Sequence, residues 1–382
     1  MGEKIALGIT FKKISKTRRI FISATGQNAG KTTFSLGLIA ALLKKYKNIG
    51  FIKPIGQRYL MEQGFKVDED SVLIERIFGI SKNLSIKDLS PVAVEKGFTE
   101  RYIEGTSKGN YAKDIVDSFN RVAKDKDLVI IEGTGHAGVG SVFDLSNATV
   151  AKLLNSKVIL LGPGGIGRPI DEFMLNRALF DKEDVKLAGV VVNKVLSDKF
   201  SKISKYVRMG LAKKKLPVLG VMPYQKRLDL PTIREIFEEV KIKLLCGKDY
   251  LENVVDKILI GAMEVGEALN YMVNNSLVIT PSDRMDMIRA IIDLQNGKLR
   301  RPCKISGLVL SGGIVPPPKV LALLEKAKIP TLLSDHDTYS IAAKIHTMKI
   351  KIKPEDKAKI GIIVNMVKRH IDIDKIVKII DS

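Results

Sequence analysis

The sequence is poor in the residue types on which several common functions depend. It has 382 residues but only two cysteines, four histidines and no tryptophan, and aromatic residues make up 6% of it. Two cysteines, Cys246 and Cys303, cannot build a disulfide framework or a cysteine-only zinc site. The histidines share no metal-ligand spacing with them. A disulfide-rich secreted domain and a zinc-finger protein are therefore excluded.

Long apolar runs and a secretion signal are also missing. No run approaches the roughly 20 apolar residues that are needed to span a bilayer. Near the N-terminus the basic cluster follows the apolar stretch, which is the reverse of the order in a signal peptide. Since 45% of the residues are apolar, the chain can still form substantial cores, in two or three domains. We expect a cytoplasmic protein with no membrane partner.

Acidic residues are scarce relative to basic ones. Lys and Arg number 63 and Asp and Glu number 42, which gives a net charge of +21. Such an excess can indicate a polyanion partner. However, the basic residues occur in short runs along the whole chain, with few aromatic residues among them to stack on bases. We interpret the charge as a lysine-rich solvated surface and expect no specific nucleic-acid complex.

Short apolar runs alternate with helical stretches from Arg19 onward. Runs that are apolar almost throughout are typical of parallel strands buried on both faces. The pattern predicts an α/β nucleotide-binding domain over 19–245, preceded by an extension over 1–18, with a mostly parallel sheet and helices on both faces. A smaller α/β domain is expected over 250–382. In it, we expect a helical segment over 250–272 and a late strand over 359–365.

The stretch TGQNAGKTT lies between the first apolar run and the first helical stretch, which is the context of a phosphate-binding loop. The standard loop would have a glycine at Thr25, and the nearest glycine comes one residue later. Lys31 is expected to reach the terminal phosphates and Thr32 to bind Mg²⁺. A helix start with an incidental lysine is the alternative. The predicted nucleotide-binding residues are Thr25, Gly26, Gln27, Asn28, Ala29, Gly30, Lys31, Thr32 and Thr33.

Charged residues at the ends of two other apolar runs complete the predicted site. Glu132 ends the run LVIIE, where open α/β sheets bind their ligands, and its carboxylate can hold Mg²⁺. Asp70 follows the second run and is a second candidate for Mg²⁺, with Asp68 as the alternative. Lys53, next to a proline, can neutralise a phosphoryl group or an acidic substrate. Lys31, Lys53 and Glu132 are the predicted catalytic residues.

Three further residues lie in loops after apolar runs. Asn193 can read adenine through its amide, or it can be a turn residue. His136 is interpreted as a loop residue outside the main site. Arg168 follows a glycine-rich turn and can add positive charge near the nucleotide.

Together these motifs resemble the dethiobiotin synthetase-like N-terminal domain of long bacterial phosphotransacetylases. Dethiobiotin synthetases have a phosphate loop that is one residue longer than the standard loop, and Ala24 stands here at its first glycine. The Lys53-Pro54 pair, with Gln57 after it, is similar to the phosphotransacetylase version. The resemblance implies a P-loop NTPase-type fold that binds ATP and Mg²⁺ through Thr32, Asp70 and Glu132. It also places Pro223, in a Leu-Gly-x-x-Pro element, on the nucleotide side.

The second region resembles the DRTGG domain, which lies between the synthetase-like and acetyltransferase parts of those enzymes. Asp283 and Arg284 are kept, whereas Met285, Asp286 and Met287 replace Thr-Gly-Gly. The Gly-Gly turn at 312–313 is expected to face a ligand or to form a dimer surface.

The resemblance implies a nucleotide-dependent regulatory protein that forms a homo-oligomer and binds a small anionic substrate or effector. The alternative is an ATP-dependent synthetase that phosphorylates a carboxylate or carbamate. Dethiobiotin synthesis is not expected, because Gln57 and Arg58 stand where that family has Ser-Gly. Phosphotransacetylase activity is not expected either, because the sequence has no acetyltransferase part.

Overall fold

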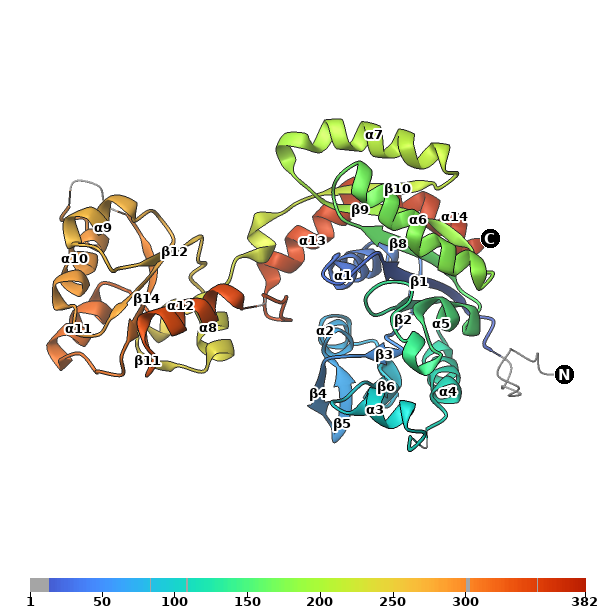
Figure 1. Cartoon of the computed structure of the whole chain (residues 1–382), viewed down its shortest axis with the longest axis horizontal. Helices are drawn as coiled ribbons and strands as arrows, with labels where there is room; N and C mark the ends of the chain where they lie inside the picture. The colour runs from blue at the N-terminus through green and yellow to red at the C-terminus, as the bar shows by residue number, and fades with distance from the viewer. Residues whose placement is uncertain (1–13, 83, 108, 300–302, 349) are drawn as a thin grey trace. The chain divides into compact units, whose positions relative to one another are not determined.

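The structure, a computed structural model, describes residues 14–82, 84–107, 109–299, 303–348 and 350–382 (Figure 1). These residues form two compact units. The first consists of the described residues within Met1–Gln225 together with Ile352–Ser382, and the second of those within Lys226–Lys351. Of the predicted extension over 1–18, residues 1–13 lie outside the described residues.

The first unit is built on a six-stranded parallel sheet in the order β10-β9-β8-β1-β7-β2. Its strands are buried almost throughout, which agrees with their continuous apolar sequences. The predicted α/β fold with a mostly parallel sheet is confirmed. The strands are β1 (Arg18–Ala24), β2 (Ile49–Ile52), β7 (Leu128–Glu132), β8 (Lys157–Gly162), β9 (Leu187–Val195) and β10 (Val218–Pro223).

Helices cover both faces of this sheet. Phe21, Ile131 and Leu160 share one apolar cluster with residues of α4 to α7. Because successive side chains of a strand point to opposite faces, α1 and the C-terminal helices lie against the other face. The helices are α1 (Lys31–Leu42), α2 (Glu69–Phe78), α3 (Phe98–Ile103), α4 (Tyr111–Ala123), α5 (Asn147–Leu153), α6 (Gly167–Lys182), α7 (Phe200–Lys213), α13 (Lys357–His370) and α14 (Ile373–Asp381).

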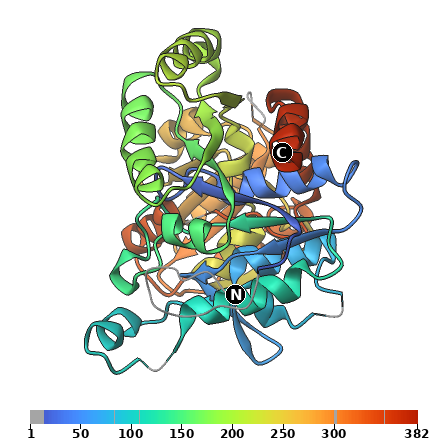
Figure 2. The same cartoon turned by 90° about the vertical axis from the view of Figure 1, so that its right-hand side faces the viewer.

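The last two helices return to the first unit, which differs from the expected division at 245–250. Helix α13 packs on α1 so closely that a Cβ atom on Gly37 would lie 2.4 Å from Val367 Cγ2. Asp381 in α14 forms ion pairs with Arg18 and Lys45. Both views show these red helices beside the blue α1 (Figures 1 and 2). The apolar face of α13 is covered by α1. Because the two helices are far apart in the sequence, no local pattern predicts this contact.

Two expected elements of the second half are wrong in type. The predicted strand over 359–365 is part of helix α13, because its buried residues Ile363, Met366 and Val367 recur at helical spacing. Within the expected helix over 250–272, Lys257–Ile260 forms strand β12 instead. A short apolar run fits either element, and here pairing with a neighbouring strand decides it.

Short strands beside the carboxyl end of β2 complete the first unit. Strand β3 (Ile55–Gly56) pairs with β6 (Val92–Ala93), and β4 (Tyr59–Glu62) forms an antiparallel hairpin with β5 (Phe65–Asp68). The hairpin leads directly into α2. It therefore carries acidic residues back to the end of the main sheet.

The second unit has a five-stranded sheet in the order β11-β15-β14-β13-β12, in which only β11 is antiparallel. Helices α9 to α11 contribute to one apolar cluster of this sheet, and α8 and α12 contribute to the other. No helix in the described part of the chain is long and apolar enough to cross a membrane. The elements are α8 (Ile233–Val240), β11 (Lys243–Cys246), β12 (Lys257–Ile260), α9 (Val265–Tyr271), β13 (Ser276–Pro281), α10 (Met285–Gln295), β14 (Ile305–Ser311), α11 (Pro318–Lys326), β15 (Thr331–Leu333) and α12 (Thr338–Thr347).

Candidate phosphate- and metal-binding site

The loop between β1 and α1 leaves the amino end of the helix open to an anion. Strand β1 lies between β7 and β8, where the strand order reverses, and such positions bind ligands at the carboxyl ends of strands. Gly30 takes a left-handed conformation with φ of 90° and caps α1 without a side-chain hydrogen bond. The first turn of α1 contains no acidic residue. Its free N–H groups and partial positive charge are therefore available to a phosphate.

Asn193 holds this loop through its side-chain amide. Its Nδ2 donates to the Ala29 carbonyl at 2.9 Å, and its Oδ1 accepts from the Lys194 N–H at 2.8 Å. A Cβ atom on Gly30 would lie 2.4 Å from Asn193 Nδ2, so the contact requires glycine there. With this geometry, the amide of Asn193 positions the loop, and its predicted contact with adenine stays a prediction.

The remaining loop residues divide into a base and a tip. The Thr25 N–H is already bound to the Leu161 carbonyl at 2.8 Å, and its hydroxyl donates to Glu172. Thr25 therefore belongs to the base of the loop rather than to its phosphate-facing surface. Gln27 and Asn28 are exposed at the tip. Gly26 has open space where a side chain would be, and Thr33 is half-buried in the first turn of α1.

The first turn of α1 is joined to Glu132 by two hydroxyl groups. Thr32 Oγ1 donates to Glu132 Oε1 at 3.0 Å, and Ser35 Oγ donates to Oε2 at 2.6 Å. Lys31 Nζ donates to the Gly135 carbonyl at 3.3 Å. Burial lowers the pKa of Lys31, although Glu132 opposes the shift. The structure thus brings Lys31, Thr32 and Glu132 together, as the sequence predicted.

Glu132 is fully buried at the end of β7. Burial, assisted by the charge of Asp70, raises the pKa of Glu132 to about 7, although Lys53 and the Ser35 hydroxyl act in the opposite direction. The carboxyl group is therefore held ready to take or lose a proton, or to gain a cation, near neutral pH.

Lys53 lies at the centre of an acidic cluster of Asp68, Asp70 and Glu132. Its Nζ forms an ion pair with Asp68 Oδ1 at 2.9 Å, is hydrogen-bonded to Asp70, and lies 3.9 Å from Glu132 Oε1. Lys53 is only 6% exposed. Asp70 and Asp68, the two alternatives for this position in the sequence, are both present in the cluster.

The pKa values of the cluster follow from burial and from these contacts. Burial alone would lower the pKa of Lys53, but Asp70, Asp68 and Glu132 together raise it above its ordinary value. Burial raises the pKa of Asp68, with Lys53 opposing it. For Asp70, the ion pair with Lys53 outweighs burial and lowers the pKa.

Mg²⁺ is implied by the resemblance, and the donor set can be tested against its chemistry. Among the described residues, no group of three or more His, Cys, Asp or Glu is arranged to hold a metal ion by itself. Mg²⁺ is commonly held by one or two carboxylates together with phosphate oxygens and water. Thr32 Oγ1 and Glu132 Oε1 lie 3.0 Å apart. Asp70 is paired with Lys53, which also lies near Glu132. This hard-oxygen set fits a Mg²⁺ ion that arrives with a phosphate.

Three residues that were singled out in the sequence lie outside the centre of the candidate site. Pro223 ends β10 at the same edge of the sheet, but β8 and β9 separate it from β1, which is roughly 14 Å at the usual strand spacing. His136 is exposed, and Arg168 forms an exposed ion pair with Glu172. Since Glu172 also accepts from Thr25, Arg168 reaches the loop only through a neighbour.

Two residues that were not predicted from the sequence support Glu132 and the loop after it. Ser35 is buried, and its spacing of three residues from Thr32 places both hydroxyls on one helix face. Asn147 Oδ1 accepts from the Thr134 N–H at 3.1 Å, and its Nδ2 donates to the Thr134 and His136 carbonyls. The helical spacing could have revealed Ser35, but nothing local in the sequence marks Asn147.

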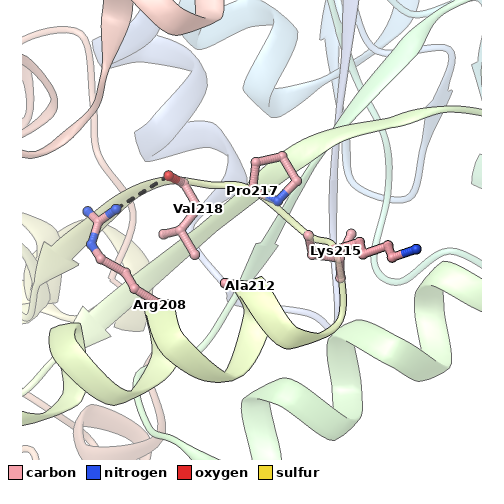
Figure 3. Close-up of a pocket in the computed structure, with 6 residues that line it drawn as sticks. Arg208, Ala212, Lys215, Pro217 and Val218 are labelled. Carbon is pink, nitrogen blue, oxygen red and sulfur yellow. Dashed lines mark hydrogen bonds between the residues drawn. The ribbon is translucent and has the colours of Figure 1, made fainter.

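A cavity of about 370 Å³ lies elsewhere in the first unit, between the end of α7 and the start of β10 (Figure 3). Figure 3 shows the Arg208 side chain bonded to the Val218 carbonyl, at 3.4 Å. Val218 begins its strand, whereas the phosphate loop follows the end of β1. The cavity is therefore at the opposite edge of the sheet and takes no part in the candidate site.

Comparisons with sequence families confirm both resemblances. The profile of AAA_26, described as an AAA domain, matches residues 18–232, which is more than half of the chain. The profile of the DRTGG domain matches residues 235–348. The match to DRTGG stops before α13, in agreement with the return of the last two helices to the first unit.

Curated relatives include phosphate acetyltransferases. The protein from Synechocystis sp. is 26% identical over 374 residues, covering 94% of this chain and 51% of the relative. The protein from Pseudomonas putida is 27% identical over 372 residues, covering 92% and 50%. The chain spans about half the length of the curated relatives it matches. A solved plasmid partition protein from Borrelia burgdorferi, bound to AMPPNP, is 14% identical, with 56% of this chain and 90% of that chain covered and a TM-score of 0.38.

Proposed function

This chain belongs to the AAA_26 family, and on that premise we propose that it binds ATP with Mg²⁺ and acts as a nucleotide-dependent regulatory protein related to the N-terminal part of phosphate acetyltransferases. The supporting observation is the bond from Thr32, in the first turn of α1, to the buried Glu132. This bond places the N-terminus of α1, the Thr32 hydroxyl and the Glu132 carboxylate next to one another. In this proposal Lys31 contacts the terminal phosphates, and Thr32, Asp70 and Glu132 hold the Mg²⁺ ion.

The bound Mg²⁺ would neutralise phosphate charge and orient the terminal phosphoryl group. Residues of the chain bind the phosphates and hold the loop in place. The open N–H groups of α1 bind phosphate oxygens, and Asn193 keeps the loop in shape by holding the Ala29 carbonyl. Lys53 neutralises the carboxylates until the nucleotide arrives.

A sensor is favoured over a synthetase by the state of Lys53. Its ammonium group is enclosed by three carboxylates, so it presents no open cation to an acid before Mg²⁺ and the nucleotide have bound. The second candidate function, an ATP-dependent synthetase that phosphorylates a carboxylate or carbamate, is favoured by the burial of this lysine next to the proposed phosphate site. We propose a homo-oligomer for the regulator, with the DRTGG domain transmitting the bound state.

The two functions are separated by measuring ATP turnover and oligomeric state in the same preparation. The regulator predicts slow hydrolysis that a panel of small carboxylic acids does not accelerate, together with a change of oligomeric state by light scattering when ATP and Mg²⁺ are added. Acceleration by one acid, with formation of its acyl phosphate or amide, would replace the regulator with the synthetase. The Lys31→Ala variant is the control for contaminating ATPase, because it keeps the fold and loses the phosphate contact.

A further inference from the structure

Lys53 occupies the place that a metal ion would need. Its Nζ is bound to Asp68 and Asp70 and lies 3.9 Å from Glu132 Oε1. Two of these three carboxylates, those of Asp70 and Glu132, are the ones proposed to hold Mg²⁺. The same oxygens cannot serve both cations fully, because a second positive charge about 4 Å away from an ammonium group is strongly repelled in a buried setting.

Lys53 supplies one of the two positive charges that offset the three carboxylates of the site. Two lysines, Lys31 and Lys53, face three carboxylates in the described part of the cluster. If Lys53 were absent, buried carboxylates would lie close together with little compensation, which is costly. If a divalent cation were present, Lys53 would no longer be needed there.

The backbone at Lys53 is held by a hydrogen bond, so we expect the response to come from its side chain. The Lys53 N–H is bound to the Leu89 carbonyl at 2.8 Å, and Pro54 follows. Ser90, the next residue after Leu89, has a fully buried hydroxyl with no partner among the described residues. The segment that is bonded to the Lys53 backbone therefore contains an unused hydrogen-bonding group.

We propose that Lys53 is the resident counter-ion of the cluster and gives up Asp70 and Glu132 to a divalent cation, so that its ammonium group accepts an anionic ligand only after the metal has bound. This inference rests on the proposed function, and it adds a binding order to the same site. The ligand class is a carboxylate or phosphate small enough to reach a buried ammonium group. The metal and its nucleotide bind first and the anion second.

The test uses the metal alone, without nucleotide. In wild-type protein Lys53 already occupies the centre of the cluster and offsets part of its charge, so millimolar MgCl₂ should leave the melting temperature unchanged relative to KCl of equal ionic strength. Lys53→Met should lower the melting temperature by roughly 10 °C, the size expected for an unpaired buried charge. MgCl₂ should restore most of that loss.

Two further variants keep the test decisive. Lys66→Met is the matched control: it breaks the half-exposed pair with Glu95 and should show no response to MgCl₂. If Lys53→Met does not fold, Lys53→Met/Asp68→Asn removes one charge of each sign, and it should fold and still gain melting temperature from MgCl₂. The proposal is overturned if MgCl₂ stabilises neither Lys53 variant more than it stabilises the wild type.

The outcome is independent of nucleotide binding. Recovery by MgCl₂ in a protein that does not bind ATP would support the counter-ion role and defeat the proposed function. ATP binding by the wild type, without recovery of either Lys53 variant, would do the reverse.

Discussion

Both units have parallel strands whose carboxyl ends meet at one edge of a sheet, but the charged side chains at these two edges differ in burial. In the first unit, the carboxyl ends of β2 and β7 bring Lys53 and Glu132 together with Asp68 of the β4–β5 hairpin, and all three residues are buried. In the second unit, the charged side chains at this edge, such as those of Arg284 and Asp286, are partly or mostly exposed and pair with each other. Buried charge is costly, so among the described residues this difference marks the first sheet end as the candidate binding site.

Buried hydroxyl groups show the same contrast. In the second unit, Ser282 donates to the Ser311 carbonyl, and Ser311 shares a hydrogen bond with Thr338. The three buried hydroxyls without a partner among the described residues are Ser23, Ser90 and Ser204, all in the first unit. Unsatisfied polar atoms are rare in folded proteins. Ser23 lies in β1 just before the phosphate loop, and Ser90 follows Leu89, whose carbonyl accepts from the Lys53 N–H, so two of the three belong to segments that position the candidate site.

The largest expected effect comes from removing the charge of Glu132. Its folded-state pKa of about 7 lies above the ordinary 4.5, so the folded protein binds more protons than the unfolded chain between these values. Its contribution to the free energy of unfolding therefore falls as pH rises from about 4.5 to 7, by about 3 kcal/mol in total. Glu132→Gln should remove this fall, as measured by urea unfolding at several pH values.

The charged neighbours of Glu132 also contribute to the pH dependence of stability. Asp70, Asp68 and Lys53 titrate in the same cluster, so the curve of the wild type is compared with that of the variant rather than with a single-site curve. A pH dependence that is unchanged in Glu132→Gln would show that the carboxyl group is not buried as described.

A smaller effect tests the assignment of α13 to the first unit. Gly37→Ala places a methyl group 2.4 Å from Val367 Cγ2, and such overpacking costs about 1–3 kcal/mol of stability. Gly361→Ala, on α13, is the matched control, because a Cβ atom there meets nothing within 4 Å. Gly37→Ala/Val367→Ala should recover part of the loss. Equal stability of the two single variants, measured by thermal unfolding, would contradict this packing.

The support of the loop by Asn193 predicts a loss of about 1 kcal/mol in nucleotide affinity for Asn193→Ala, because the hydrogen bond to the Ala29 carbonyl disappears, as does the Lys194 N–H bond to the same amide. The measurement is calorimetric titration with a non-hydrolysable ATP analogue. A loss of stability with full affinity would instead limit Asn193 to the fold.

The smallest effect is expected in the second unit. Arg284→Ala removes an ion pair with an exposed partner, so the melting temperature should change by no more than about 1 °C, and ATP affinity should stay constant. A large change in ATP affinity would show that the second unit contributes to the nucleotide site, and the contrast between the two sheet ends would no longer hold.

The sequence predicted the parallel sheet because strands buried on both faces have continuous apolar runs. It also predicted the convergence of Lys31, Thr32 and Glu132, because carboxyl ends of neighbouring parallel strands meet at one edge. It failed for α13, where a run of seven residues over 359–365 is apolar enough for either element. The enclosure of Lys53 was also hidden, because Asp68 reaches it only through the β4–β5 hairpin.

The most direct test of the central claim is calorimetric titration of ATP, with and without Mg²⁺, into wild-type protein and Lys31→Ala. We expect Mg²⁺-dependent binding that weakens by at least ~2 kcal/mol, about 30-fold, when the buried charged contact to the phosphates is lost. Lys344→Ala, at an exposed lysine of the second unit, should bind as the wild type does. Unchanged ATP affinity in Lys31→Ala would contradict a nucleotide site at the β1–α1 loop.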